Sequence, residues 1–366
     1  MSGIWIGWED KIKEIKMTLR KNEDIGPACM IYQGERPHPA HRVFGNAIGC
    51  EYKHFEGRFR NNNGGGSNIR NIFKRAITGI EIPSKYNVVV AEGSSVLQTM
   101  LVYKTVKNRR SKCIYLAADE TFHTLQKKKT RHVWKLIKPF VNISIDGCIS
   151  VSDLAYEWCK PHIGSVNHEI VHPPIGDEKY DSLIGLTPKS SQENFTVVSI
   201  GNNRDSKNYA RLGESFGKIV NTIDSDAKLI IVGSGHENER YSKEKYIQTP
   251  GNVSIDRLTD ILNEASVYIQ PSKSDAFPVA SLEAMLSATP TIVTDQVGTK
   301  TLIPKNQIVS ATVDGIYEGI KKLHEMSEKD RIKTGNAHRE EVSDLTEKNQ
   351  AEKFNDAIMK LMRNNE

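Results

Sequence analysis

The sequence predicts an α/β protein with two consecutive units, each a doubly wound parallel sheet with helices on both faces. The chain has 366 residues, which is long enough for two domains of ordinary size. Short apolar runs alternate with segments whose apolar residues are three and four positions apart, as expected for strands alternating with helices. The alternation stops in a polar stretch at about 176–194 and then restarts, which indicates a boundary between two units.

Six strand-like runs predict the strands of the first unit. They lie at 28–32, 51–55, 87–91, 113–117, 147–151 and 168–172. Segments with helical spacing, such as 69–77 and 95–106, separate most of them. A Trp-containing amphipathic segment from Trp8 to about Arg20 predicts a helix before the first strand.

The second unit repeats this pattern. Strands are predicted at 195–201, 228–233, 267–270, 291–294 and about 308–311, with helices at 209–222, 257–265 and 316–326. A charged helix with one apolar face begins at about Leu345. We therefore divide the chain into a first domain at 1–178, a linker at 179–194, a second domain at 195–340 and a C-terminal helix at 341–366.

Composition and cysteine content predict a cytoplasmic protein. Charged residues make up 26% of the chain and the net charge is +5, which suits a phosphate-bearing ligand or an anionic surface without proving either. The five cysteines include no Cys-x-x-Cys pair, and four lie in or beside apolar runs, which predicts reduced thiols. No apolar stretch has the length of a membrane span, and the N-terminus lacks a signal-peptide core. Nucleic-acid binding is not predicted, because no array of stacking aromatics accompanies the basic residues.

The most informative segment is 271–298, which reads PSKSDAFPVASLEAMLSATPTIVTDQVG. It follows an apolar strand and contains a loop with Asp275, a helix with Glu283 and, after Pro290, a second apolar strand. Ligands of parallel sheets bind where strands end and helices begin, and the two acids flank that junction. The alternative is an ordinary strand-helix-strand unit in which Glu283 lies on a solvated helix face.

This segment resembles the donor-sugar motif of retaining glycosyltransferases with the GT-B fold, known as glycosyl transferases group one or glycosyltransferase family four. The family pattern is an acid, Gly and Phe, then Glu-Ala-Met, a Gly, and a Pro before the next strand. The positions that agree are Phe277, Glu283, Ala284, Met285, Pro290 and Gly298. The positions that differ are Asp275 in place of Glu, and Ala276 and Ala288 in place of Gly. The resemblance implies two Rossmann-like domains that face a cleft, with the final helix crossing back to the first domain.

The resemblance also implies how the donor phosphates are held. Family members follow the first strand of the second domain with Gly-Arg and, a few residues later, with Lys-Gly or Lys-Asn. Here Gly201 and Lys207-Asn208 agree, whereas Asn202 stands in the arginine position and the nearest arginine is Arg204. A lysine and the free N–H groups at a helix start can face the same anion. The alternative is an exposed lysine at a helix start, where the helix dipole disfavours it.

The implied reaction moves a sugar from a UDP- or GDP-linked donor with retention of configuration, without a metal and without a cofactor. Loss of the nucleoside diphosphate leaves negative charge on the phosphates, which the catalytic candidate Lys207 would stabilise. The catalytic candidate Asp275 would hold sugar hydroxyls near the positively charged anomeric carbon, and Glu283 would bind the ribose hydroxyls. The remaining donor-binding candidates are Gly201, Arg204, Ala276, Phe277 and Pro278.

The acceptor candidates lie in the first domain. A polar loop after the first strand contains Glu35, Arg36 and His38, where family members place a loop that binds acceptor and phosphate. An ordinary surface loop would have the same composition. Asp119 ends a later strand, where many relatives keep a His or Asp near the transferred sugar, and it is the catalytic candidate of this domain.

Thr124–Val141 has six positive charges, no acid, and apolar residues largely at helical spacing. A basic amphipathic helix of this kind can lie on an anionic membrane, which would make the protein peripheral on the cytoplasmic membrane face. The alternative is a domain helix that packs on the sheet while its lysines contact water.

The leading functional hypothesis is therefore a retaining, metal-independent glycosyltransferase that acts on a glycan, a lipid-linked acceptor or a protein hydroxyl. The second hypothesis is a catalytically inactive GT-B partner subunit that binds a glycan or nucleotide, as the differences at Asp275 and Asn202 would suggest. A third, a nucleotide-sugar epimerase, ranks last because those enzymes lack the Glu-Ala-Met run after Phe.

Overall fold

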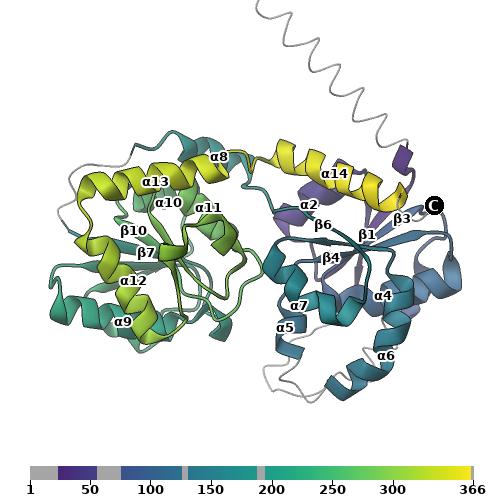
Figure 1. The fold of residues 1–366 in the computed structure, drawn as a ribbon, viewed down its shortest axis with the longest axis horizontal. Coiled ribbons are helices and arrows are strands. Elements are labelled where there is room, and N and C mark those ends of the chain that lie inside the picture. Colours follow the sequence, from purple (N-terminus) through teal and green to yellow (C-terminus); the bar gives the residue numbers. More distant parts are fainter. Residues whose placement is uncertain (1–23, 56–75, 126–130, 188–193, 364–366) are drawn as a thin grey trace, which may run out of the picture. The chain divides into compact units, whose positions relative to one another are not determined.

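The computed structural model describes residues 24–55, 76–125, 131–187 and 194–363 of the chain. Within these residues the chain forms two compact units (Figure 1). The first unit comprises the chain up to Pro173 together with 348–366, and the second comprises Pro174–Glu347. Each unit has its own six-stranded sheet, and all the strand pairs are parallel.

The sheet of the first unit has the strand order β2-β1-β3-β4-β5-β6. Its strands are β1 (Ala28–Gln33), β2 (Glu51–Phe55), β3 (Val88–Glu92), β4 (Lys112–Ala117), β5 (Gly147–Ser150) and β6 (Asn167–Ile170). The helical segments are α2 (Pro39–Ala47), residues 76–81, η1 (Ser94–Val96), α4 (Leu97–Val102), η2 (Tyr103–Lys107), α5 (Thr121–Leu125), α6 (Arg131–Ser144) and α7 (Asp153–Ile163). Each strand overlaps one of the six predicted runs, so the alternation of strands and helices in this unit is confirmed.

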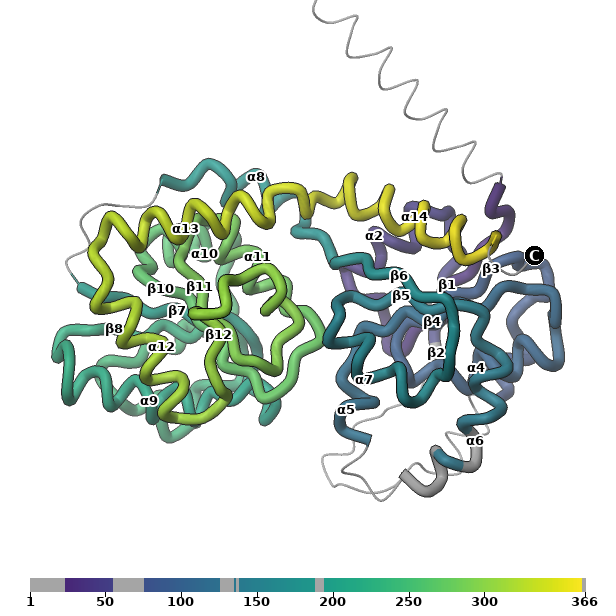
Figure 2. The backbone as a smooth tube through the Cα atoms, viewed as in Figure 1, coloured from purple at the N-terminus to yellow at the C-terminus, as the bar shows by residue number. Residues whose placement is uncertain are grey.

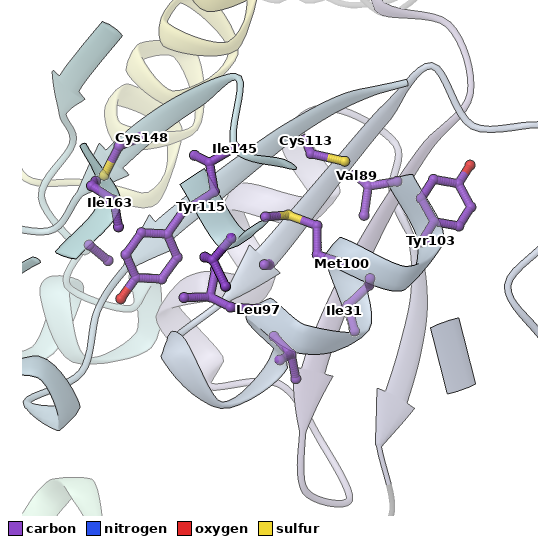
Figure 3. Close-up of a cluster of buried hydrophobic side chains, with 14 of the residues drawn as sticks. Ile31, Val89, Leu97, Met100, Tyr103, Cys113, Tyr115, Ile145, Cys148 and Ile163 are labelled. Atoms are coloured by element: carbon purple, nitrogen blue, oxygen red, sulfur yellow. The ribbon is translucent and has the colours of Figure 1, made fainter. Parts of the chain in front are cut away.

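Apolar side chains from both the sheet and the helices form the core of the first unit. Leu97 and Met100 of α4 lie over the sheet, close to side chains of β1, β3 and β4 (Figure 3). All five cysteines are free, and the four that lie in this unit's strands and helix α7 are buried. Burial raises the pKa of the Cys29 and Cys113 thiols to about 12, which keeps both protonated and unreactive at neutral pH.

The C-terminal helix α14 (Glu347–Arg363) packs against the first unit, although it follows the second unit in the chain (Figure 2). The ring of Phe354 stacks on Phe44 of α2 with 4.7 Å between the ring centroids. The side chain of Asn355 donates a hydrogen bond to the carbonyl of Ala47, and Leu361 is fully buried near Gly147. An apolar face on a charged helix is what such packing requires.

The sheet of the second unit has the strand order β12-β11-β10-β7-β8-β9. Its strands are β7 (Thr196–Ile200), β8 (Lys228–Val232), β9 (Ile247–Gly251), β10 (Val267–Gln270), β11 (Thr291–Thr294) and β12 (Ile308–Val309). The α-helices are α8 (Asp177–Ile184), α9 (Tyr209–Thr222), α10 (Ile255–Asn263), α11 (Val279–Leu286), α12 (Val313–Glu325) and α13 (Glu328–Val342). Short 3₁₀ helices are η3 (Asp205–Lys207), η4 (Tyr241–Lys243), η5 (Gly298–Leu302) and η6 (Lys305–Gln307).

The predicted linker at 179–194 differs from the structure. Residues 177–184 form helix α8, which packs against α10 and α11, so the second unit begins at Pro174 and not at 195. This short helix was not predicted because Leu183 is its one fully buried apolar residue, and a single apolar residue gives no helical spacing. Helix α13 likewise lies where no helix is predicted, because its contacts are made by the small or polar residues Gly335 and His338 as well as by Val342.

His338 gives the second unit a pH-dependent stability. Its Nδ1 accepts a hydrogen bond from the backbone N–H of Thr291, and its Nε2–H donates to the side chain of Gln307. Burial lowers the pKa of His338 from about 6.5 to about 4, so the folded chain keeps this imidazole neutral while the unfolded chain protonates it below about pH 6.5. This contribution to stability is complete above pH 6.5 and is lost as the pH falls towards 4.

We expect His338 to account for about 2 kcal/mol of unfolding free energy lost between pH 7 and pH 5. The measurement is denaturant unfolding followed by circular dichroism at both pH values, in the natural chain and in His338→Gln. The substituted chain should lose less stability on acidification. An unchanged pH dependence in His338→Gln would contradict the prediction.

Within the described ranges, no helix has the length and hydrophobicity needed to cross a bilayer. The structure describes the predicted basic segment only in part, because Lys127, Lys128 and Lys129 lie outside the described residues. In α6, Phe140 and Ile143 are exposed and Lys138 donates a hydrogen bond to the carbonyl of Pro161. Contact of this segment with a membrane stays a prediction.

Candidate active site

The topology of the second sheet identifies where a ligand would bind. From β7 the chain passes to β8 and β9 on one side of the sheet, whereas β10, the other neighbour of β7, leads to β11 on the opposite side. The loops after β7 and β10 therefore diverge, and the space between them is the switch point at which doubly wound sheets bind ligands. Those two loops contain 201–207 and 271–278, which hold most of the donor-site residues predicted from the sequence.

Lys207 and Asp275 meet at this switch point. The ammonium Nζ of Lys207 lies 2.5 Å from Oδ2 of Asp275, and both side chains are largely buried. Asn208 follows in the left-handed region at φ 65°, and its side chain donates hydrogen bonds to the carbonyls of Pro271 and Ala311. Asn208 thus joins the two loops and holds Lys207 beside Asp275.

The backbone of Asp275 is fixed independently of its side chain. Its N–H donates to the carbonyl of Gln296, and its carbonyl accepts from the N–H of Gly298, which starts η5. Ala276 and Phe277 follow and are buried. Pro278 precedes the first residue of α11 and has no N–H, so the donors at this helix start come from later residues of the helix.

Glu283 lies on α11 and is 4% exposed, which excludes the alternative of a solvated helix face. Its Oε1 accepts a hydrogen bond from Nζ of Lys179 at 2.6 Å. No partner of the other oxygen, Oε2, is found among the described residues. Sequence reasoning missed Lys179, because it lies in α8, in the stretch interpreted as a linker.

The loop after β7 is tied to the loop after β8. The carbonyl of Gly201 accepts a hydrogen bond from Nε2 of the buried His236. The N–H of Gly201 donates to the carbonyl of Val232. A side chain at Gly233 would collide with the Gly201 carbonyl, so this close approach requires glycine. The side chain of Asn202, which stands in the family's arginine position, accepts hydrogen bonds from the N–H and hydroxyl of Ser234.

Two more cations lie on these loops. Arg204 is exposed, and its side chain forms no hydrogen bond or ion pair within the part of the chain that the structure describes. Lys273, which the sequence analysis did not single out, pairs with Asp205 at 2.7 Å. The backbone N–H of Lys273 donates to the carbonyl of Ser206, the residue before Lys207. Asp205 is 93% exposed, so water screens this pair and little holds Lys273 in place.

The catalytic candidate of the first unit, Asp119, stabilises the turn after β3 through its hydrogen bonds. Its Oδ2 accepts a hydrogen bond from the N–H of Ser94 at 2.8 Å, and its Oδ1 accepts from the N–H of Thr121. A Cβ on Gly93, whose φ is 78°, would lie 2.7 Å from Oδ2. The carboxylate therefore has its hydrogen bonds committed within the loops after β3 and β4.

The acceptor candidates Glu35, Arg36 and His38 are exposed on the loop between β1 and α2. Of the three, His38 contacts a charged group, because its backbone N–H donates to Glu92 at 3.3 Å. The same carboxylate binds His41, which the sequence analysis did not select. Its partner Glu92 lies 51 positions away, so only the fold shows the pair.

Comparison with known proteins places this second unit in a family. Residues 187–341 match the sequence model described as Glycosyl transferases group 1. The second unit belongs to this family. Over 183 residues the chain is 24% identical to the mouse GDP-Man:Man(3)GlcNAc(2)-PP-Dol alpha-1,2-mannosyltransferase. This match covers 44% of the chain. The match spans 37% of the mouse enzyme, so the chain corresponds to well under two thirds of that relative.

Solved structures establish the fold across both units. Sucrose-phosphate synthase from Thermosynechococcus elongatus superposes with a TM-score of 0.71 at 11% identity, covering 92% of this chain and 99% of the synthase. The Anabaena protein Alr3699/HepE, solved with UDP and glucose, gives 0.67 at 13% identity and covers 93% and 100%. A glycosyltransferase from Rickettsia africae gives 0.69 at 14% identity, with the same coverage. The predicted GT-B fold with two Rossmann-like domains is confirmed.

Proposed function

We propose that the chain is a glycosyltransferase that moves a sugar from a nucleoside-diphosphate sugar to a hydroxyl acceptor. One observation supports this most directly: Lys207 and Asp275 form a cation-carboxylate pair at the switch point of a group 1 domain. A cation there suits the phosphates of a donor, and a carboxylate suits the hydroxyls of its sugar. The buried carboxylate of Glu283 is available in the same unit for the ribose.

In the proposed reaction, the bond between the anomeric carbon and the diphosphate oxygen breaks and the acceptor oxygen bonds to that carbon. The departing phosphate oxygen takes the proton of the acceptor hydroxyl. Negative charge grows on the diphosphate as it leaves, and Lys207 stabilises it, assisted by Lys273 and Arg204 on the same two loops. Once the diphosphate binds Lys207, Asp275 is released from its ion pair to accept hydrogen bonds from the sugar.

We further propose that the reaction retains the anomeric configuration and needs no metal. Retention is supported by the donor motif around Asp275 and Glu283, and by the mouse relative, whose name pairs GDP-Man with an alpha-1,2 transfer. Metal independence is supported by three basic side chains (Lys207, Lys273 and Arg204) on the loops of the switch point, which can neutralise a diphosphate.

The test is a screen of UDP-glucose, UDP-N-acetylglucosamine and GDP-mannose by thermal shift, followed by release of the free sugar from the donor that binds. The Anabaena protein is solved with UDP-glucose and the mouse relative is named for GDP-Man, so both bases belong in the screen. We expect one donor to raise the melting temperature and to be hydrolysed slowly. NMR of the sugar transferred from an α-configured donor should show an α-linkage.

Other outcomes would change the proposal. A β-linked product would contradict retention, and loss of activity in EDTA would contradict metal independence. Binding of a donor with no hydrolysis and no transfer would favour the inactive partner subunit, to which the differences at Asp275 and Asn202 point. Absence of binding to every donor would contradict the proposed function as a whole.

A further inference from the structure

The first unit has a switch point of its own, at the ends of β1 and β3. From β1 the chain passes through α2 to β2 on one side, whereas β3, the other neighbour of β1, leads to β4 on the opposite side. The loops that diverge there are 34–38 and the turn that begins at Gly93. This is the position in the first sheet that the Lys207–Asp275 pair occupies in the second.

A histidine and a carboxylate bridge this switch point. Glu92 is the last residue of β3, and His41 lies in the first turn of α2. Oε1 of Glu92 lies 2.5 Å from Nδ1 of His41, and the two side chains are 12% and 10% exposed. The N–H of His38 donates to the same oxygen, and the His38 and His41 ring centroids are 4.9 Å apart.

Packing fixes the orientation of both side chains. The ring of His41 lies nearly parallel to that of Phe44, which in turn stacks on Phe354 of α14. Behind Glu92, Asp119 holds the turn at Gly93 and Ser94 through the Ser94 N–H. A histidine-carboxylate pair held by this number of contacts is pre-organised, as a binding group needs to be.

The hydrogen bond also determines which nitrogen is available. An ionised carboxylate can only accept, so the proton between His41 and Glu92 lies on Nδ1. In the neutral ring Nε2 is then an acceptor, and Nε2 has no hydrogen-bond partner among the described residues. The second oxygen of Glu92, Oε2, is buried and likewise has no partner within the described ranges. Each of these two acceptor atoms therefore lacks a donor within the described ranges.

We propose that His41 and Glu92 form a binding site in the first unit for an uncharged ligand with hydroxyl groups, such as a sugar or polyol. Nε2 of His41 accepts the hydrogen bond of one hydroxyl, and Glu92 holds the ring in the tautomer that allows this. The proposal rests on the proposed function in one respect: in a glycosyltransferase, this hydroxyl belongs to the acceptor of the transferred sugar.

Charge favours a hydroxyl over a phosphate at this site. An imidazole that carries its proton on Nδ1 alone is neutral, and the pair then has the negative charge of the carboxylate. Even with a fully protonated ring the pair is only neutral, so it attracts no anion. A phosphate-binding site would need an excess of positive charge or several converging N–H donors.

The experiment is NMR of the full-length chain labelled with ¹⁵N in its histidines, which reports the protonation of each ring nitrogen without any turnover. His41 is assigned by the signal missing from His41→Asn, a variant whose amide can still donate to Glu92 but which lacks Nε2. We expect His41 to carry its proton on Nδ1. Methyl α-D-mannopyranoside, used as the probe, should shift the Nε2 signal, and inorganic phosphate should leave it in place.

His41→Asn should weaken binding of the methyl mannoside, measured from shifts elsewhere in the first unit, by about three- to tenfold, as expected for one hydrogen bond between uncharged groups. The matched control is His324→Asn, which alters another histidine-carboxylate pair, that with Asp224 in the second unit, and should leave binding unchanged. A proton on Nε2, a shift with phosphate but not with the mannoside, or no shift with either would overturn the proposal. Each of these outcomes is independent of the donor screen, which tests the proposed function.

Discussion

We expect Lys207→Ala to lower the rate constant kcat of sugar transfer by at least about 100-fold, the loss typical when one pre-organised electrostatic donor to a developing negative charge is removed. Lys207 is suited to this role because its Nζ lies at the switch point of the second sheet, within 2.5 Å of Asp275 and largely screened from water. A diphosphate gains most charge as it departs, so the substitution should lower kcat more than it raises the donor KM.

The readout is steady-state transfer, or donor hydrolysis, with the nucleotide sugar selected in the screen. Lys207→Ala leaves Asp275 without its partner, and an unpaired, largely buried carboxylate lowers stability. Thermal unfolding of Lys207→Ala measures that loss of stability, so kcat is compared at a temperature at which both the natural and the substituted chain are folded. The matched control is Lys218→Ala, which breaks an exposed Lys–Asp pair in the same unit and should leave kcat unchanged. A kcat within tenfold of the natural value would contradict the role of Lys207.

The reasons why some elements could be predicted and others not are physical. The central strands of the first sheet, β1, β3, β4 and β5, are short, buried runs such as 88–91, so their composition alone reveals them. Strand β9 is an edge strand that contains Pro250 and Gly251, and a strand with one free edge needs neither continuous apolar residues nor every N–H. Helices α8 and α13 were missed because few of their contacts use large apolar side chains.

The candidate site divides in the same way. Asp275 and Glu283 are eight positions apart in one motif, and local sequence was enough to select them. Lys179 pairs with Glu283 across 104 positions and Glu92 pairs with His41 across 51, so no local pattern contains either pair. Asp119 was selected by analogy with relatives, and in the structure its hydrogen bonds hold the turn after β3.

One departure from the family motif, Ala288, strains the backbone. Ala288 stands where the family has glycine after the motif helix, and its φ of 58° lies in the left-handed region that glycine adopts without strain. The carbonyl of Ala288 also lies against Gly335 of α13, where a Cβ would collide with it. In this chain, alanine therefore occupies a backbone conformation after α11 that glycine would adopt without strain.

Glu283→Gln should raise the donor KM by about 10- to 100-fold while changing kcat little, because a hydrogen bond to a charged group contributes about 1.5–3 kcal/mol and the ribose is far from the bond that breaks. Glu283 is 4% exposed, and a carboxylate buried to this degree stays ionised only with a cation beside it. Lys179 supplies that cation at 2.6 Å and leaves Oε2 for the ligand. Glutamine keeps the shape of the side chain, so the comparison isolates the charge.

Lys179 gives this prediction its strongest test. If the lysine acts by keeping Glu283 ionised and oriented, Lys179→Met raises the donor KM as well, and the double variant Lys179→Met with Glu283→Gln is no worse than Glu283→Gln alone. Lys179→Arg, which can donate to the same oxygen, should restore most of the affinity. If the two substitutions raise the donor KM by independent factors that multiply in the double variant, Lys179 and Glu283 act separately. An unchanged donor KM in Glu283→Gln would mean that this carboxylate does not bind the ribose. Non-additive losses in KM, with kcat preserved, are the result expected if α8 holds the donor-binding carboxylate in place.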